Sequence, residues 1–143
     1  MIEEVTRDEV VPLRHEVLRT GLPIETARYP EDDSPQVFHL ADREPDGTII
    51  ACVSFFPEDL GGEPGWRFRG MATRESRRNT GVGGRLLEAG VDEVVKRGGT
   101  LVWCNGRSGA SAFYLRHGFK IISDEYVSGP RLIPHYLFAR SLG

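Results

Sequence analysis

The sequence of 143 residues lacks any apolar run near the ~18 residues that a membrane-spanning helix needs. It also lacks low-complexity tracts and internal repeats, and its length fits a single domain, residues 1–143. The segment 1–5 is acidic and does not have the basic-then-apolar pattern of a leader. We therefore expect a cytoplasmic, globular protein that does not bind membranes.

Cysteine is scarce, since the chain contains only Cys52 and Cys104, each within an apolar, strand-like run. A disulfide framework needs more cysteines than this, and a metal site needs ligands that cluster. The two side chains are therefore expected to be buried, reduced thiols, and no metal ion is expected.

The chain also lacks the basic surplus of a general nucleic-acid-binding protein, because its net charge is −3. Its arginines are unevenly distributed, however, and several gather around one glycine-rich segment where only Glu75 opposes them. These are Arg67, Arg69, Arg74, Arg77, Arg78 and Arg85. Such a cluster suits a ligand with phosphate groups, although a solvated basic face would have the same composition.

The glycine-rich segment, residues 78–84, lies between a predicted strand and a predicted helix. Residues 66–73 alternate large and small side chains, and residues 85–97 have helical periodicity. The first N–H groups of a helix have no partners within it and lie at the positive end of its dipole. The turn therefore predicts a backbone anion site. The apolar positions of the helix are Leu87, Val91, Val94 and Val95.

Two common phosphate-binding patterns do not fit this turn. A dinucleotide-binding loop needs a third glycine at the position of Leu86, and a P-loop needs a Gly-Lys-Ser/Thr end that the chain nowhere contains. What remains is Arg-x-x-Gly-x-Gly, from Arg78 to Gly83. By itself this pattern also fits a turn that only reverses the chain.

A second motif lies downstream, where residues 110–119 read Ala-Ser-Ala-Phe-Tyr-Leu-Arg-His-Gly-Phe. With the first, it resembles the GNAT superfamily of N-acetyltransferases, which has a coenzyme A pyrophosphate loop followed by an Ala-x-x-Phe-Tyr-x-x-x-Gly-Phe signature. The resemblance is strong over residues 66–123. It implies a GNAT-like α/β (α+β) fold, with a mixed, mostly antiparallel sheet of about six or seven strands flanked by about three or four helices.

The flanking segments complete this fold in outline. Thr6 and Glu9 form a capping-box pattern that opens a helix through about Arg19. A short helix near 109–117 is expected to end at Gly118. Besides the strand at 66–73, strands are expected at 2–6, 36–42, 48–56, 100–105, 119–126 and 134–139.

Residues 24–35 are irregular, acidic and contain proline. In GNAT proteins the corresponding region shapes the acceptor pocket, so we expect this loop to influence substrate choice. Two interpretations of its carboxylates stay open: they attract an amine substrate, or they only make this a solvated, acidic loop. They are Glu25, Glu31, Asp32 and Asp33.

The resemblance implies direct transfer of an acetyl group from acetyl-CoA to a primary amine, with many relatives acting as homodimers. In the family, the strand before the loop splays from its neighbour and binds the pantetheine arm and acetyl carbonyl, a role that maps to Met71, Ala72 and Thr73. The loop binds the pyrophosphate, a role that maps to Arg78, Asn79, Thr80, Gly81, Val82, Gly83 and Gly84. Asn105 would hydrogen-bond the pantetheine arm, although Arg107 occupies the position where the family's asparagine is expected.

Tyr114 matches the tyrosine that protonates the departing thiolate in the family, while its ring alone would also pack against coenzyme A. His117, at a helix end, is interpreted as structural. The general base stays open among Glu25, His39, Glu58, His135 and a water chain. A non-catalytic acyl-CoA sensor is the alternative function, because it would keep the loop without needing Tyr114.

Overall fold

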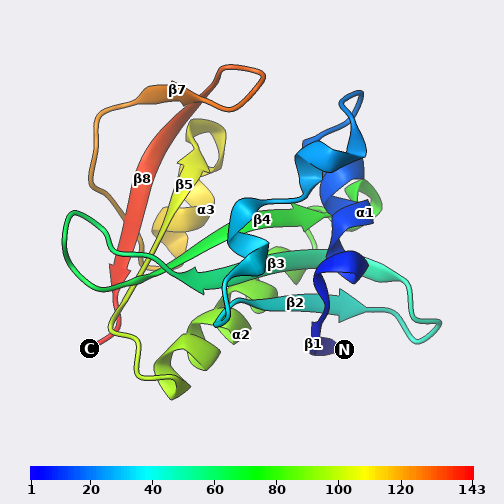
Figure 1. Ribbon diagram of the computed structural model, residues 1–143, viewed down its shortest axis with the longest axis horizontal. Helices are drawn as coiled ribbons and strands as arrows, with labels where there is room; N and C mark the ends of the chain where they lie inside the picture. The colour runs from blue at the N-terminus through cyan, green and yellow to red at the C-terminus, as the bar shows by residue number, and fades with distance from the viewer.

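An eight-stranded sheet organises the molecule, and the computed structural model describes every residue from Met1 to Gly143. The strands are β1 (Ile2–Val5), β2 (Phe38–Arg43), β3 (Ile49–Pro57), β4 (Trp66–Thr73), β5 (Leu101–Arg107), β6 (Lys120–Ile121), β7 (Tyr126–Ser128) and β8 (Ile133–Ser141). Their order is β1-β2-β3-β4-β5-β8-β6, with β7 paired to β8 beside this path (Figure 1). Only the β4–β5 pairing is parallel. The mixed, mostly antiparallel sheet expected from the sequence is confirmed.

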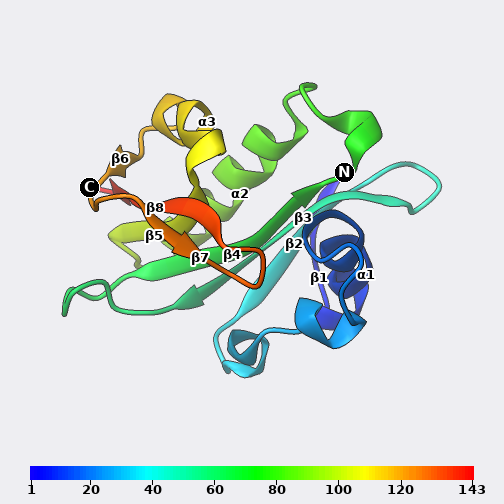
Figure 2. The same ribbon diagram turned by 90° about the horizontal axis from the view of Figure 1, so that it is seen from above.

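Three α-helices cover the two faces of the sheet. They are α1 (Arg7–Leu18), α2 (Val82–Lys96) and α3 (Ser111–Arg116). Seen from above, α1 lies on one face, and α2 and α3 lie on the other (Figure 2). None of these helices has the length and apolar character needed to cross a lipid bilayer. Short 3₁₀ turns occupy η1 (Ile24–Ala27), η2 (Pro30–Asp33), η3 (Glu75–Arg77) and η4 (Ser108–Ala110).

The larger hydrophobic core lies between α2 and the sheet, where Val91 and Val94 are buried in one cluster with Phe55. The helix approaches closely because residue 90 is glycine; a Cβ atom there would lie 2.1 Å from the Phe55 ring. Val95, which the sequence placed on this buried face, is 50% exposed. The prediction was wrong because successive residues turn by about 100° around a helix, which carries residue 95 past the core.

The smaller core packs α1 on the opposite face, with Val10 and Leu13 buried beside Cys52. The predicted capping box is confirmed. The Glu9 N–H donates to Thr6 Oγ1, and the Thr6 N–H donates to the Glu9 carboxylate. Both cysteines are buried thiols, as expected. Burial raises the pKa of the Cys52 thiol to about 12, so this group stays neutral at physiological pH.

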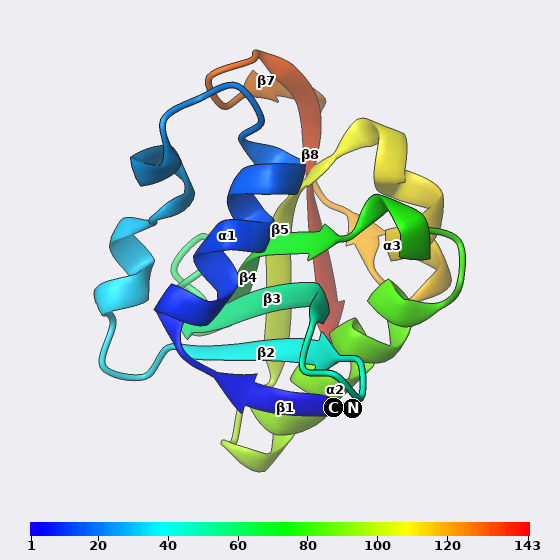
Figure 3. The ribbon, with the colours of Figure 1, turned by 90° about the vertical axis from the view of Figure 1, so that its right-hand side faces the viewer.

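The predicted strand over 119–126 is wrong, because the chain pairs with β8 only at its two ends, through β6 and β7. Between them, Ser123 Oγ accepts a hydrogen bond from the Leu137 N–H at 2.9 Å. A side chain thus takes the place of a backbone partner, and the chain leaves the sheet there. The irregular stretch 24–35 contains η1 and η2, which lie beside α1 in Figure 3.

Candidate active site

The candidate site begins where β4 and β5 separate. These two parallel strands pair at Trp66 with Val102 and at Arg67 with Trp103, and at no residue beyond. Past this point a cleft of about 1320 Å³ opens beside the free edge of β4. The splay that the family resemblance implied is therefore present, and β4 offers unpaired backbone groups to the cleft.

Most of the predicted binding positions line this cleft together, although they come from separate parts of the chain. Thr80 is the exception: it lines a smaller hollow of about 470 Å³ instead. Its hydroxyl group donates a hydrogen bond to the Arg77 carbonyl. The positions that line the cleft are Met71, Ala72, Thr73, Arg78, Asn79, Gly81, Val82, Gly83, Gly84, Asn105 and Tyr114.

The backbone N–H groups from Asn79 through Gly84 have no hydrogen-bond acceptor within the protein, and the first N–H that is bonded again is that of Arg85, to the Gly81 carbonyl. No side chain caps this end of α2. Gly81 has φ +83°, a left-handed conformation that strains residues with a Cβ atom. The segment therefore presents a row of free donors at the positive end of a helix dipole, which suits an anion.

Gly83 and Gly84 differ in what surrounds them. A Cβ atom at Gly84 would lie 2.8 Å from His117 Nε2, so packing inside the protein requires a glycine there. A Cβ atom at Gly83 would meet nothing closer than Thr73 Oγ1, at 3.5 Å. Packing within the protein therefore does not explain the glycine at position 83. Its lack of a side chain leaves the space above the N–H groups free for a ligand.

Glu88 holds the helices around this loop together. His117 Nδ1 lies 2.8 Å from its carboxylate, and Arg140 Nη1 donates to both of its oxygens at 3.1 Å. Burial opposes ionisation of Glu88, but the bonds from His117 and Arg140 outweigh it and lower the pKa of the carboxyl group. The interpretation of His117 as a structural residue agrees with this arrangement.

Tyr114 of α3 is 9% exposed and lines the cleft. Its ring packs against Phe138, with centroids 4.5 Å apart, and the absence of a side chain at Gly106 makes room for it. Burial, followed by the neighbouring Cys104 thiol, raises the pKa of the Tyr114 phenol. The hydroxyl group therefore keeps its proton at neutral pH and is a donor, not a base.

Of the four side chains considered as a general base, only His135 lines the cleft. His39 is buried in β2, where its Nδ1 lies 2.6 Å from Ser54 Oγ. Glu58 forms an ion pair with Arg67 at 3.3 Å, and Glu25 lies exposed on η1.

The imidazole of His135 is oriented by its neighbours. Nδ1 lies 2.6 Å from the Ile133 carbonyl, which can only accept, so Nδ1 carries the proton and Nε2 keeps its lone pair. The ring also stacks on Tyr126, with centroids 6.1 Å apart. The hydroxyl group of Tyr126 donates to Asn105 Oδ1, which leaves the Asn105 NH₂ group as its remaining donor.

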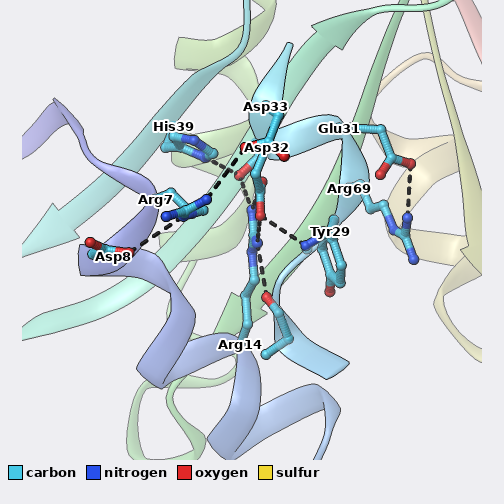
Figure 4. A network of polar contacts seen from close by, with 12 residues as sticks. Arg7, Asp8, Arg14, Tyr29, Glu31, Asp32, Asp33, His39 and Arg69 are labelled. Atoms are coloured by element: carbon cyan, nitrogen blue, oxygen red, sulfur yellow. Dashed lines mark hydrogen bonds and ion pairs between the residues drawn. The ribbon is translucent and has the colours of Figure 1, made fainter. Parts of the chain in front are cut away.

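Figure 4 shows carboxylates of the acidic loop bound to arginines. Asp32 is buried and accepts two hydrogen bonds from Arg14, at 2.8 and 2.9 Å. Burial opposes ionisation of Asp32, but the bonds from Arg14 and the Tyr29 N–H lower the pKa of this carboxyl group. Asp33 pairs with Arg7 at 3.4 Å. Three of the four carboxylates of the loop are thus paired with arginines, whereas Glu25 is exposed and has no ion-pair partner.

The other part of the cleft is lined by residues from distant segments of the chain, among them Arg19, Tyr29 and Arg131. Tyr29, at the start of the acidic loop, has Arg69 Cζ 3.9 Å and Arg19 Cζ 5.8 Å from its ring centroid. Arg131 in the β7–β8 loop donates to the Thr20 carbonyl, which joins that loop to the end of α1. No local pattern marks these residues, because only the fold brings them together.

We use two names for the parts of the cleft. The loop half comprises residues 71–73, 78, 79, 81–84 and Tyr114, and the arginine half comprises Arg19, Tyr29, Arg67, Arg69 and Arg131.

Comparison with known proteins agrees with this geometry. Uncharacterized N-acetyltransferase YitI of Bacillus subtilis (strain 168) is 30% identical over 128 residues, which cover 87% of this chain and 85% of the relative. Aminoglycoside 6'-N-acetyltransferase complexed with coenzyme A superposes with a TM-score of 0.78 at 18% identity, covering 100% of this chain and 97% of that one. Escherichia coli ElaA superposes with a TM-score of 0.79 at 16% identity, covering 98% and 99%.

The model of the Acetyltransferase (GNAT) family matches residues 3–119, which is most of the chain. That range includes the splayed strand, the glycine-rich turn and Tyr114. The chain therefore belongs to the GNAT family and is an N-acetyltransferase.

Proposed function

We propose that residues 1–143 act as one domain that transfers an acetyl group directly from acetyl-CoA to a primary amine. The observation that carries this proposal is the row of unpartnered N–H groups from Asn79 through Gly84. Such a row binds the pyrophosphate through the backbone, so the side chains of Asn79, Thr80 and Val82 matter little. The free edge of β4 at Met71, Ala72 and Thr73 then receives the pantetheine arm and the acetyl carbonyl, and the Asn105 amide donates to that arm.

In the proposed reaction, the amine nitrogen forms a bond to the carbonyl carbon and the carbon–sulfur bond breaks. His135 Nε2 accepts the proton that the nitrogen loses, and the Tyr114 hydroxyl group gives its proton to the departing thiolate. Return of the proton from His135 to Tyr114 through solvent restores both groups. The raised pKa of the Tyr114 phenol supports its role as the acid, because it holds the proton until a basic thiolate forms.

The row of free N–H groups is tested by Gly83→Val, because a Cβ atom at this position would meet no atom of the protein closer than 3.5 Å. The valine is expected to cover the N–H groups and to weaken coenzyme A binding by at least about 100-fold, as expected for the loss of two charge-assisted hydrogen bonds. Calorimetry measures the affinity, and a thermal melt verifies the fold. Gly83→Ala, with a smaller side chain, is the matched control and should weaken binding less. Unchanged affinity in a folded Gly83→Val variant would contradict the proposal.

The role of His135 is tested by His135→Gln, which keeps a polar side chain without a basic nitrogen. We expect kcat/KM to fall about 100-fold, the usual scale of general-base catalysis, while coenzyme A affinity is unchanged. The acid limb of the pH–rate profile should also disappear. A variant that retains that limb would assign the base to another group or to water. The homodimer implied by the family resemblance stays a prediction.

A further inference from the structure

The arginine half of the cleft has more positive than negative charge. Among the residues that line the whole cleft, the only carboxylates are Glu88 and Asp92, both on α2. Glu88 is already bound by His117 and Arg140. No carboxylate therefore lines the half where an acceptor would enter beside β4.

Nearby carboxylates neutralise only part of the positive charge of the guanidinium groups in this half. Arg69 donates to Glu31 at 2.8 Å, and Arg67 shares the same carboxylate at 3.6 Å while also pairing with Glu58 at 3.3 Å. Two carboxylates thus face two arginines, and Arg19 and Arg131 add two further charges that have no acidic partner.

Arg19 and Arg131 donate only to backbone carbonyl groups. Arg19 bonds to the Thr26 and Leu18 carbonyls, at 3.3 and 3.2 Å, and Arg131 bonds to that of Thr20. These bonds hold the two side chains in place without cancelling their charge. The remaining N–H groups of each guanidinium are free to bind a ligand.

The nearest acidic side chains cannot reverse this balance, because they are committed elsewhere (Figure 4). Asp32 has a 2% exposed side chain, bound to the buried Arg14, and Asp33 pairs with Arg7. Glu31 is shared by the two arginines of β4. Glu25 has no ion-pair partner, but it is exposed on η1 and does not line the cleft, so the loop places no free carboxylate in the cleft lining.

We propose that the acceptor of this enzyme is an amine that also carries an anionic group, bound by Arg19, Arg69 and Arg131. The inference rests on the proposed acetyl transfer and names its substrate class. Guanidinium groups bind carboxylates and phosphates through paired N–H donors, and the aromatic ring of Tyr29 holds two of them in position. An acceptor with several ammonium groups, such as an aminoglycoside, would instead meet like charge.

Matched pairs of acceptors test this inference, because each pair keeps the amine and removes only the anion. Amino acids are compared with their amides, and phosphoethanolamine with ethanolamine; spermidine and tobramycin serve as cationic acceptors. In at least one pair, kcat/KM for the anionic member should exceed that for its neutral partner by at least about tenfold, which is the effect expected of one charge-assisted hydrogen bond. The two pairs distinguish a carboxylate from a phosphate. Preference for the neutral or cationic acceptors would overturn the inference while leaving acetyl transfer intact.

Substitutions of single arginines test where the anionic group of the acceptor binds. Arg69→Gln and, independently, Arg131→Gln should lower kcat/KM for the preferred anionic acceptor about tenfold or more and hardly change it for the neutral partner. Arg28→Gln is the control, because Arg28 is exposed and lies outside the cleft. Equal losses for both members of a pair would show a structural role and overturn the assignment.

Binding provides a readout apart from turnover. N-acetylated amino acids and their amides are titrated into the protein saturated with coenzyme A. Tighter binding of the carboxylates, lost in Arg131→Gln, supports the inference even if no acceptor in the panel is acetylated. Absence of any preference overturns it. Failure to bind coenzyme A would instead refute the proposed function.

Discussion

In the loop half of the cleft, the groups that face a ligand are main-chain N–H groups of one segment, 79–84. In the arginine half, they are guanidinium groups just after α1, on β4 and in the β7–β8 loop, which are far apart in the sequence. The first arrangement depends on local backbone conformation, and the second depends on how distant elements pack. The loop half therefore suits a phosphate ligand through its backbone, whereas the arginine half depends on which side chains the fold brings together.

The largest effect should come from Arg14→Met, which breaks the support beneath the arginine half. Arg14 is fully buried and donates to Asp32, to the Ala27 carbonyl and to Ser54 Oγ. Its loss leaves the Asp32 side chain buried without a charged partner, with only the hydrogen bond from the Tyr29 N–H, so the free energy of unfolding should fall by about 3–5 kcal/mol. Urea denaturation measures this change.

Stability and coenzyme A affinity should respond differently in the Arg14→Met variant. Coenzyme A affinity at a temperature where the protein is folded should change little, because the loop half does not contact Arg14. Adding Asp32→Asn should restore part of the stability, since no unpaired charge remains. A large loss of coenzyme A affinity in the folded single variant would show that the halves are not independent.

Tyr114→Phe tests the chemistry of the loop half. Removal of the hydroxyl group should lower kcat about 100-fold or more, because a general acid is lost, while the ring keeps its packing against Phe138. Thiol release measures turnover, and calorimetry measures coenzyme A affinity, which should be unchanged. If the variant turns over as fast as the unsubstituted protein, Tyr114 is not the acid and its ring serves only for packing. If the unsubstituted protein itself shows no turnover, the alternative function as an acyl-CoA sensor is favoured.

Two neighbouring glycines of the loop half, Gly83 and Gly84, should respond differently to substitution by alanine. Gly84→Ala should lower stability by about 1–3 kcal/mol, because its methyl group meets His117 Nε2. Gly83→Ala should instead raise stability by up to about 1 kcal/mol, because alanine is favoured over glycine in a helix and the position has room. Thermal melts measure both. Equal destabilisation by the two changes would mean that Gly83 is also required by the fold.

The smallest expected effect is a pH dependence of stability that arises beneath the arginine half. Burial, followed by the charge of Arg14, lowers the pKa of His39. The unfolded chain, with a histidine pKa of about 6.5, then binds the proton more readily than the folded chain. The His39 contribution is complete above about pH 6.5 and is lost as the pH falls through the lower folded value. Urea denaturation between pH 7.5 and 5 measures it, and His39→Gln should flatten that part of the profile.

The sequence predicted the elements that depend on local patterns. The Thr6–Glu9 capping box, the helix after the glycine-rich turn and the strands on either side of it were all found, and Gly118 has the positive φ expected of a helix-ending glycine. It failed over 119–126, where a contact between Ser123 and the distant Leu137 interrupts the strand. It also misplaced Val95, because periodicity alone does not fix the exact edge of a buried face.

The loop half follows from local sequence, because a glycine-rich turn before a helix leaves N–H groups unbonded wherever it folds. The charge of the arginine half depends instead on packing between distant elements. Three carboxylates of the acidic loop, Asp32, Asp33 and Glu31, are bound by Arg14, Arg7 and Arg69, and Glu25 does not line the cleft. A charge acts on a ligand only if no closer partner neutralises it, and those partners are set by packing between elements that are distant along the chain.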